Sequence, residues 1–365
     1  MSVRRLGIRL FVLLVKSAIA VALVILLVRQ QRIDLQTIRA IRPGPMLYAL
    51  IALACAGVFG GLLLMAWRLR LFLVQGRFDI SYKDTLRLTL LGSFVGAVLP
   101  GLVGGDAVKA AYLCGQVEER RMDAVVAVMV DRAIGLYALF VLGGVASLIG
   151  LAAGILWLPK SVLFASPSIV ALGLLAGALF SLDSVRNFPP LNTLGSKMPG
   201  MVRIFIRSIG DYLRSPRLVF SAIGISVLNH ALVVLAFVCA AALIADPLSL
   251  LAHFVVDPLA MAMNVIPLTP GGIGIAESAF SYLYGSVGSG DGALVGLFGR
   301  LLQYFVFTLA GVPALIISRF SIWRMCFPEP GKQDEQVRKS NGESDLRVTT
   351  QGENGDAALG GPKGK

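Results

Sequence analysis

The chain has 365 residues, of which 56% are hydrophobic and only 15% are charged. With a mean hydropathy of +0.79, this composition excludes a soluble globular domain and predicts an all-α polytopic membrane protein. The formal net charge is +12, but residues 328–365 carry six basic and seven acidic side chains, so the positive excess belongs to the membrane part. Such basic loops mark the cytoplasmic side and favour anionic head groups, and the sequence offers no soluble basic domain for nucleic acid.

The N-terminal third of the sequence predicts two membrane helices. We expect residues 10–28 to form a retained helix rather than a cleaved signal peptide, because Lys16 interrupts the apolar run. A second helix is expected over residues 46–67, where Trp67 and Arg68 combine an aromatic and a basic side chain as at a membrane interface. The first helix and the second are followed by basic segments.

An uncharged run over residues 88–105 ends in the first of two breaker motifs. Pro100 and Gly101 cannot continue a helix comfortably, and charge follows at once in Asp106 and Lys109. We expect Lys109 to contact lipid head groups at the interface. Irregular backbone at membrane depth is tolerated only where protein or a water-filled cavity surrounds it, so this motif predicts a re-entrant segment.

The rest of the membrane part repeats this order. Full membrane helices are expected over residues 123–154, 163–182, 218–244 and 291–318. The second breaker motif, residues 267–277, contains Pro267 and Pro270. Backbone N–H groups at a loop-to-helix junction such as Gly105–Asp106 suit an anion, so we expect Gly104, Gly105, Gly271 and Gly272 to be substrate-binding positions. The alternative is that these glycines only allow close helix packing.

Loop charge predicts the orientation. If both breaker motifs are re-entrant, six full crossings remain and both termini are cytoplasmic. The basic loops 68–87 and 183–217 then lie inside, whereas loops 245–257 and 277–291 lie outside and contain no Lys or Arg. The basic segment 29–42 lies outside and breaks the rule.

This order predicts two inverted repeats within a transmembrane domain of residues 1–327. The repeat halves cover about residues 5–158 and 160–325, and their re-entrant tips approach the membrane midplane from opposite faces, as in alternating-access carriers. The polar tail, residues 328–365, has the composition of a disordered segment.

Charged residues at membrane depth are costly and are the first candidates for a site. Arg132 and Arg300 suit a lipid phosphate, because a guanidinium forks onto phosphate oxygens. Asp106 and Glu277 suit pairing with those arginines in the empty site, or recognition of a cationic head group. Static ion pairs that fix helix packing are an equally open interpretation.

Asp131 is also a candidate substrate-binding residue at membrane depth. Asp131 is next to Arg132, so their side chains point about 100° apart on a helix and do not serve only each other. Asp257 is a further charged candidate at membrane depth, and His230 is expected to be a hydrogen-bonded core histidine. Scattered cysteines and the two histidines show no metal spacing, so we expect no metal and no cofactor. The sequence also lacks a Walker A motif and any hydrolase pattern.

Three motifs together resemble the lysylphosphatidylglycerol synthase transmembrane region family. Residues 99–109 are similar to its LPG-x-x-GGD-x-x-R/K signature, residues 130–136 to its DR-x-x-GL helix, and residues 267–277 to its P-x-x-PGG-x-G-x-x-E segment. Arg300 matches the arginine of its last helix, and the resemblance covers roughly residues 5–325.

The resemblance implies a flippase-like membrane domain. In the multiple peptide resistance factor such a domain is assigned the movement of aminoacylated phosphatidylglycerol between leaflets, and stand-alone members are linked to hopanoid and glycolipid pathways. We expect no synthase activity, because the sequence lacks the soluble aminoacyltransferase domain. The residues that match the family motifs or the breaks beside them are Pro100, Gly101, Gly104, Gly105, Asp106, Asp131, Arg132, Pro267, Pro270, Gly271, Gly272, Glu277 and Arg300.

The sequence therefore predicts a protein of the bacterial inner membrane that moves a polar-headed phospholipid or glycolipid between leaflets. Its expected partners are membrane lipids with anionic, polyprenyl-linked or glycolipid head groups. An alternative is a non-transporting membrane partner of a lipid-modifying glycosyltransferase, or of hopanoid or glycolipid biosynthesis. A third is an intramembrane transferase.

Overall fold

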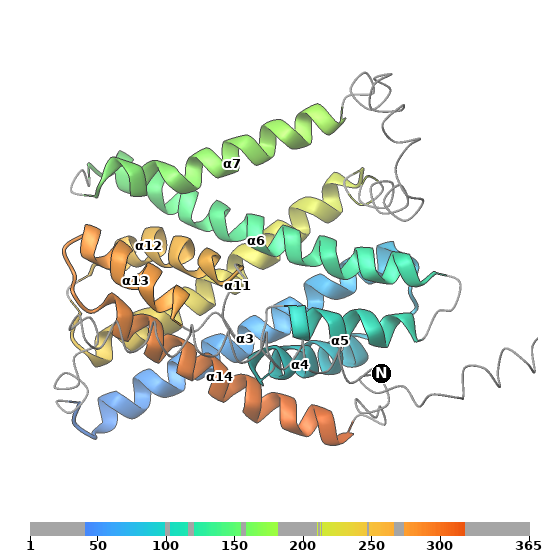
Figure 1. The fold of residues 1–365 in the computed structure, drawn as a ribbon, viewed down its shortest axis with the longest axis horizontal. Coiled ribbons are helices and arrows are strands. Elements are labelled where there is room, and N and C mark those ends of the chain that lie inside the picture. The colour runs from blue at the N-terminus through green and yellow to red at the C-terminus, as the bar shows by residue number, and fades with distance from the viewer. Residues whose placement is uncertain are drawn as a thin grey trace, which may run out of the picture. The chain divides into compact units, whose positions relative to one another are not determined.

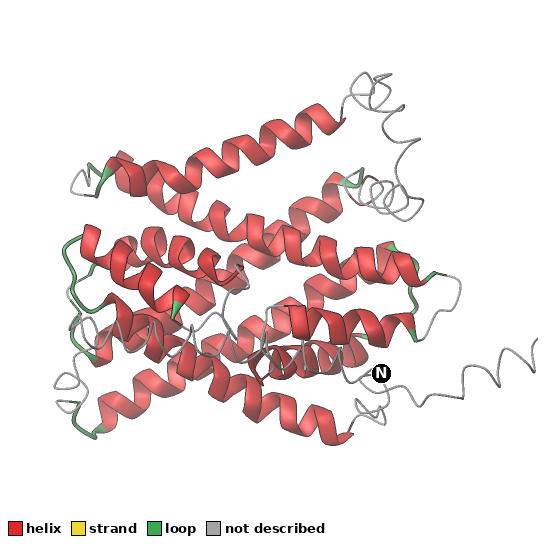
Figure 2. Ribbon diagram, in the orientation of Figure 1, coloured by secondary structure: helices red, strands yellow, loops and turns green. Residues whose placement is uncertain are grey.

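The computed structural model describes residues 41–98, 103–115, 120–154, 158–181, 210, 212, 214–246, 248–265 and 274–317, all within one compact unit, Met1–Ile317. These residues form nine α-helices and one short 3-10 turn, and no strand occurs among them (Figure 2). The expected helix over residues 10–28 and the polar tail lie outside the described residues. The described part is all-α, as the composition predicts.

The helices follow the predicted order along the chain. Their bounds are α3 Pro45–Gln75, α4 Tyr82–Val98, α5 Val103–Cys114, α6 Arg121–Ala152, α7 Lys160–Ser181, α11 Pro216–Leu243, α12 Leu250–Ala262, the 3-10 turn η1 Met263–Val265, α13 Ile275–Ser286 and α14 Gly292–Ile317. By length and composition, α3, α6, α11 and α14 can each cross a membrane. The chain is therefore a polytopic membrane protein, and α7 adds an apolar helix of 22 residues.

Two pairs of shorter helices form hairpins that enter the bundle from opposite ends (Figure 1). The α4–α5 hairpin starts and finishes at the end where α3 ends and α6 begins, which we name the basic end. The α12–α13 hairpin starts and finishes at the other end, where α11 ends and α14 begins. Neither hairpin crosses from one end to the other, as expected of re-entrant segments.

The packing of the hairpins repeats in inverted form. The α4 leg of the first hairpin packs on α14, and the α12 leg of the second packs on α6, so each hairpin leans on the last long helix of the other half. The helices that precede the hairpins, α3 and α11, pack on each other. This reciprocal arrangement is the one that two inverted repeats produce.

Glycines allow the central helices to approach closely. A Cβ atom on Gly57 of α3 would lie 3.0 Å from the carbonyl oxygen of Leu232, and one on Gly61 would lie 2.6 Å from Oδ1 of Asn229. Leu232 and Asn229 belong to α11. Apolar helices in lipid gain little from hydrophobic burial against each other, so this close backbone contact is what lets dispersion forces hold α3 against α11.

The legs of the first hairpin touch through backbone atoms. A Cβ atom on Gly105 of α5 would overlap the carbonyl oxygen of Gly92 in α4, and one on Gly92 would lie 3.1 Å from the carbonyl oxygen of Gly105. Gly105 therefore has a packing role in addition to any binding role. The contact fixes the start of α5, and with it the position of Asp106 one residue later.

Two sequence predictions about basic side chains are wrong. The helix expected to stop near Trp67 continues to Gln75, and Arg68 is 5% exposed within it rather than at an interface. Most of the expected loop 68–87 is therefore helical. Lys109 is 4% exposed and does not reach the lipid surface, because its ammonium group pairs with Asp106. In both cases an acidic partner, Asp131 or the partly exposed Asp106, holds the basic side chain inside the protein.

The hairpin contact gives a direct test by thermal or chemical unfolding in detergent. We expect Gly105→Ala to lower the free energy of unfolding by about 1–3 kcal/mol, because the new methyl group overpacks a backbone contact. The matched control is Gly224→Ala in α11, where a Cβ atom would meet nothing within 4 Å. That change should leave stability equal or raise it by up to about 1 kcal/mol. Equal stability of the two variants would show that the legs are not in contact.

Candidate functional site

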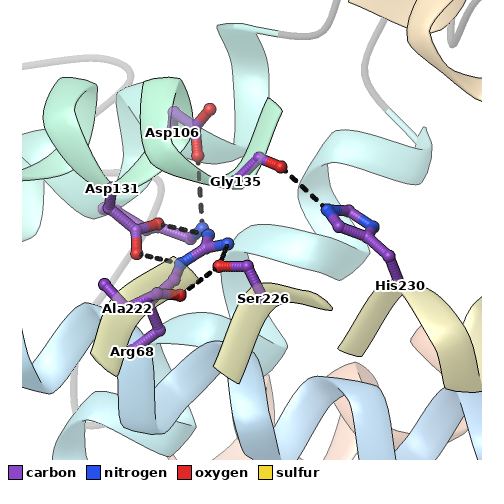
Figure 3. A network of polar contacts seen from close by, with 8 residues as sticks. Arg68, Asp106, Asp131, Gly135, Ala222, Ser226 and His230 are labelled. Atoms are coloured by element: carbon purple, nitrogen blue, oxygen red, sulfur yellow. Dashed lines mark hydrogen bonds and ion pairs between the residues drawn. The ribbon is translucent and has the colours of Figure 1, made fainter. Parts of the chain in front are cut away.

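The first charge pair joins the α4–α5 hairpin to α6. Arg132 Nη1 donates to Asp106 Oδ2 at 2.7 Å (Figure 3). Lys109 Nζ donates to Oδ1 of the same carboxylate at 3.2 Å. One carboxylate thus faces two cations, so the group carries one surplus positive charge. The Arg132 side chain is 41% exposed, whereas the Lys109 side chain is only 6% exposed.

The position of Asp106 follows from the local sequence. Asp106 lies in the first turn of α5. The hairpin directs this helix start toward the interior of the bundle (Figure 1). The N-terminus of a helix carries partial positive charge, which stabilises a carboxylate there and also favours a bound anion.

The second charge pair joins the α12–α13 hairpin to α14. Arg300 Nε lies 3.2 Å from Glu277 Oε1, and Arg300 Nη2 donates to Asn264 Oδ1 at 2.8 Å. Glu277 Oε2 accepts the backbone N–H of Gly274 at 2.6 Å. Gly274 has φ +86°, in the left-handed region that favours glycine, so Glu277 closes the start of α13 as a capping residue.

The two charge pairs are built in the same way. In each, an acidic residue in the first turn of the second hairpin helix meets an arginine of the next long helix. They differ in burial: Glu277 is 1% and Arg300 7% exposed, whereas the first pair is partly open. Glu277 Oε1 is buried and makes no hydrogen bond among the described atoms, in spite of the nearby Arg300 Nε.

A buried ion pair, which we name the anchoring pair, lies beside the first charge pair. Arg68 Nε and Nη2 donate to the two carboxylate oxygens of Asp131 at 2.7 and 2.9 Å (Figure 3). Arg68 Nη1 donates to Ser226 Oγ at 2.9 Å, and that hydroxyl donates to the carbonyl of Ala222. Both charged side chains are about as buried as the apolar core, at 6% and 5% exposed. The anchoring pair therefore ties α3, α6 and α11 together.

His230 closes this polar network. Its Nε2 lies 2.9 Å from the carbonyl oxygen of Gly135 on α6. Gly135 also gives space to Arg68, because a Cβ atom there would lie 2.6 Å from Arg68 Nη1. The predicted hydrogen bond of His230 to a neighbour is therefore observed, with the side chain partly buried.

At the basic end, packing holds the start of α11 against the end of α3. Tyr212 packs edge-on against Phe72, with ring centroids 5.8 Å apart. Burial, followed by the charge of Asp123, raises the pKa of Tyr212 to about 12. The phenol therefore stays neutral at physiological pH and acts as a packing group.

The structure places part of the predicted site. The predicted pairing of Asp106 with Arg132 and of Glu277 with Arg300 is observed, and Asp131 is separated from Arg132 as expected. Gly104 and Gly105 lie in the first turn of α5. The predicted residues Pro100, Gly101, Pro267, Pro270, Gly271 and Gly272 lie outside the described residues. A single cavity shared by Asp106 and Glu277 stays a prediction.

Sequence reasoning missed the partners of these groups. Arg68, Lys109 and Asn264 each hold a charged residue in place. Only the spacing of Lys109, three residues after Asp106, gave a local signal, since residues three apart on a helix face each other. In the part of the chain that the structure describes, no group of three His, Cys, Asp or Glu side chains could hold a metal ion.

The anchoring pair predicts a strong and asymmetric effect on stability. We expect Arg68→Leu or Asp131→Leu to lower the free energy of unfolding in detergent by about 3–5 kcal/mol, because each leaves a buried charge without its partner. The double variant should recover most of that loss. The control is Arg87→Ala in an exposed pair with Asp84, expected to change stability by at most about 1 kcal/mol. Additive losses in the double variant would contradict the pairing.

Comparison with known proteins finds a family of membrane domains and one membrane protein that are similar to this chain. Residues 13–311 match the model of the family described as Lysylphosphatidylglycerol synthase TM region. A protein named UPF0104 membrane protein, from Methanothermobacter thermautotrophicus, is 23% identical over 327 residues, which cover 83% of this chain and 94% of the relative. The family match spans most of the sequence, including both hairpins and both charge pairs. The chain belongs to the lysylphosphatidylglycerol synthase transmembrane region family.

Proposed function

We propose that this protein moves a polar-headed lipid between the leaflets of a bacterial inner membrane. The head group would bind at the charge pairs on the two hairpins, while the acyl or polyprenyl tails stay in the bilayer. The observation that carries the proposal is the repetition of one acid–arginine pair on two hairpins that enter from opposite ends. Carriers with inverted repeats use such discontinuous helices to expose one site alternately to each side.

Arg132 supports a site that is open to a ligand. It is the twelfth residue of α6, so it lies about 17 Å along the helix from the basic end, at a rise of about 1.5 Å per residue. A charged side chain at that depth is costly unless it faces a polar cavity or a polar ligand. Because the side chain is nevertheless 41% exposed, a lipid head group is a suitable partner for its guanidinium.

Charge favours a phosphate at the first charge pair. Asp106 neutralises only one of its two cationic neighbours, Lys109 and Arg132, which leaves one positive charge for an anion. A guanidinium binds phosphate through two parallel hydrogen bonds, which a neutral sugar does not reproduce. The unsatisfied Oε1 of Glu277 is an acceptor for a hydroxyl or ammonium group on the same or another head group.

The charges at the two ends support an orientation with the basic end in the cytoplasm. The described residues near that end include Arg77, Lys83, Arg87, Arg120, Arg121, Arg214 and Arg217. The other end has fewer basic residues: its described charged residues are Asp246 and Asp291, together with Arg42 before α3 and Lys160 at the start of α7. By the positive-inside rule, the α4–α5 hairpin then enters from the cytoplasm, and both termini lie inside.

The proposal is tested by a leaflet-resolved lipid-movement assay in proteoliposomes with a labelled phospholipid. We expect Arg132→Ala and Arg300→Ala each to slow movement about tenfold or more, since a hydrogen bond to a charged group contributes about 1.5–3 kcal/mol and about 1.4 kcal/mol corresponds to tenfold. The control is Arg87→Ala, an exposed arginine of the same basic end, which should move lipid at the rate of the unchanged protein.

Other outcomes separate the alternatives. Movement at the unchanged rate in both variants would rule out the arginines as head-group ligands. No lipid movement by the folded protein, together with stable co-purification of a lipid-modifying enzyme, would favour the non-transporting partner instead. Product formation from a lipid-linked sugar by the purified protein would favour a transferase.

A further inference from the structure

A second cluster of titratable side chains lies within the α12–α13 hairpin and is not part of the charge pairs. The Tyr284 hydroxyl donates to Asp257 Oδ1 at 2.7 Å. His253 Nδ1 lies 2.8 Å from the same hydroxyl oxygen and 3.3 Å from Asp257 Oδ2. The three residues are 0–2% exposed. Asp257 and His253 come from α12 and Tyr284 from α13, so the cluster joins the two legs of the hairpin.

In the part of the chain that the structure describes, no Lys or Arg pairs with the cluster, and the one group beside Asp257 that can become a cation is His253, by taking up a proton. In the tautomer with a proton on Nδ1, His253 and Tyr284 are neutral donors to an ionised Asp257, and the group carries one full negative charge. No described Lys or Arg pairs with Asp257; its other charged neighbour is Asp246, which adds repulsion. A buried carboxylate without a counter-ion costs several kcal/mol even after relaxation of the protein.

The elements packed against α12 do not supply that counter-ion. The α6 segment of residues 138–150 contains no charged side chain, and the only charged residue of α7 is Lys160 at its exposed start. The last turns of α11, after His230, contain no Lys or Arg. On α13 the other acidic group is Glu277, which Arg300 already neutralises, and η1 contributes the neutral Asn264. Among the described residues, a proton is therefore the cation that can neutralise Asp257.

We propose that Asp257, His253 and Tyr284 form a proton-binding site that couples lipid movement to a proton gradient. Asp257 takes up one proton from the aqueous phase on one side, becomes a neutral carboxylic acid, and releases that proton to the other side after the hairpin has moved. The proposal rests on the transport function proposed above and adds the source of energy.

Proton binding changes the contacts that hold the hairpin legs together. The ionised carboxylate only accepts hydrogen bonds, which suits two donors; the neutral acid carries an O–H group and becomes a donor as well. The Tyr284 and His253 contacts then have to rearrange. Tyr284 lies seven residues after Glu277 on α13, which is about 10 Å or two turns along the same helix face. A change at the cluster thus reaches the second charge pair through one short helix.

The backbone beside Asp257 is suited to such a movement. Pro258 lies inside α12, where it has no N–H to donate to the carbonyl of Phe254. Prolines inside helices are common positions of kinks. Pro258 also lies against Gly143 of α6, where a Cβ atom would approach Pro258 Cβ to 3.4 Å. A helix that lacks one internal hydrogen bond next to its titrating residue bends there at lower cost than elsewhere.

The test compares Asp257→Asn with the unchanged protein in proteoliposomes that carry a labelled phospholipid and an imposed pH gradient. We expect the unchanged protein to accumulate lipid in one leaflet, in a direction that reverses with the gradient. Asp257→Asn should equalise lipid between leaflets without responding to the gradient. The control is Asp84→Asn, an exposed carboxylate of the basic end, which should keep the full response.

A second measurement does not require lipid movement. Infrared difference spectra of the purified protein between high and low pH should contain the band of a carboxylic acid forming, and that band should be missing in Asp257→Asn and displaced in Tyr284→Phe. If the band is present but no variant moves lipid, the proton site stands and the transport function fails. If lipid moves regardless of the gradient and the band is unchanged in Asp257→Asn, the proton site is overturned while the transport function stands.

Discussion

The bidentate pair of Arg68 and Asp131 is the contact on which the rest of the first half depends. It fixes the rotation of α6 relative to α3, because two parallel hydrogen bonds leave a guanidinium one orientation. Arg132 is the next residue of α6, so the rotation that buries Asp131 also turns Arg132 toward Asp106. The ion pair in the core thereby sets the direction of the Arg132 side chain, which is the proposed head-group ligand. In lipid no water competes for either charge, so the pair has no alternative partner outside the protein.

Pseudo-symmetry explains why two charge pairs exist but not why they differ. Each hairpin packs on the last long helix of the other half, so the first legs of the two hairpins are held by equivalent helix contacts. Yet the Asp106 pair has an additional lysine and an exposed arginine, whereas the Glu277 pair is fully enclosed and caps its own helix. The more open Asp106 pair and the enclosed Glu277 pair are compatible with the proposed alternating mechanism, in which one side of a carrier is open while the other is closed.

The order of residues in the sequence was sufficient to predict the two hairpins and the two charge pairs. Proline and glycine beside charge marked both breaks, and an acid followed by an arginine some 25 residues later repeated in both halves. Local sequence patterns could not predict partners that lie far apart in the sequence. Trp67 and Arg68 look like an interface anchor, because nothing near them reveals that Asp131, 63 residues away, neutralises the arginine. The same holds for Tyr284, whose partner Asp257 is 27 residues away on the other leg of the hairpin. Only the fold brings such groups together.

The three buried acidic residues of the described core differ in how completely their partners compensate the charge. Asp131 has a bidentate arginine and a hydroxyl behind that arginine, which is a complete set of partners. Glu277 has an arginine and a backbone N–H, but one of its oxygens is left without a hydrogen bond. Asp257 has only neutral or titratable partners. The penalty for a buried charge rises along this series, because each step removes part of the compensation. A group whose charge is least compensated gains most from a ligand or a proton, so the proposed proton site lies where the hairpin compensates a buried charge least.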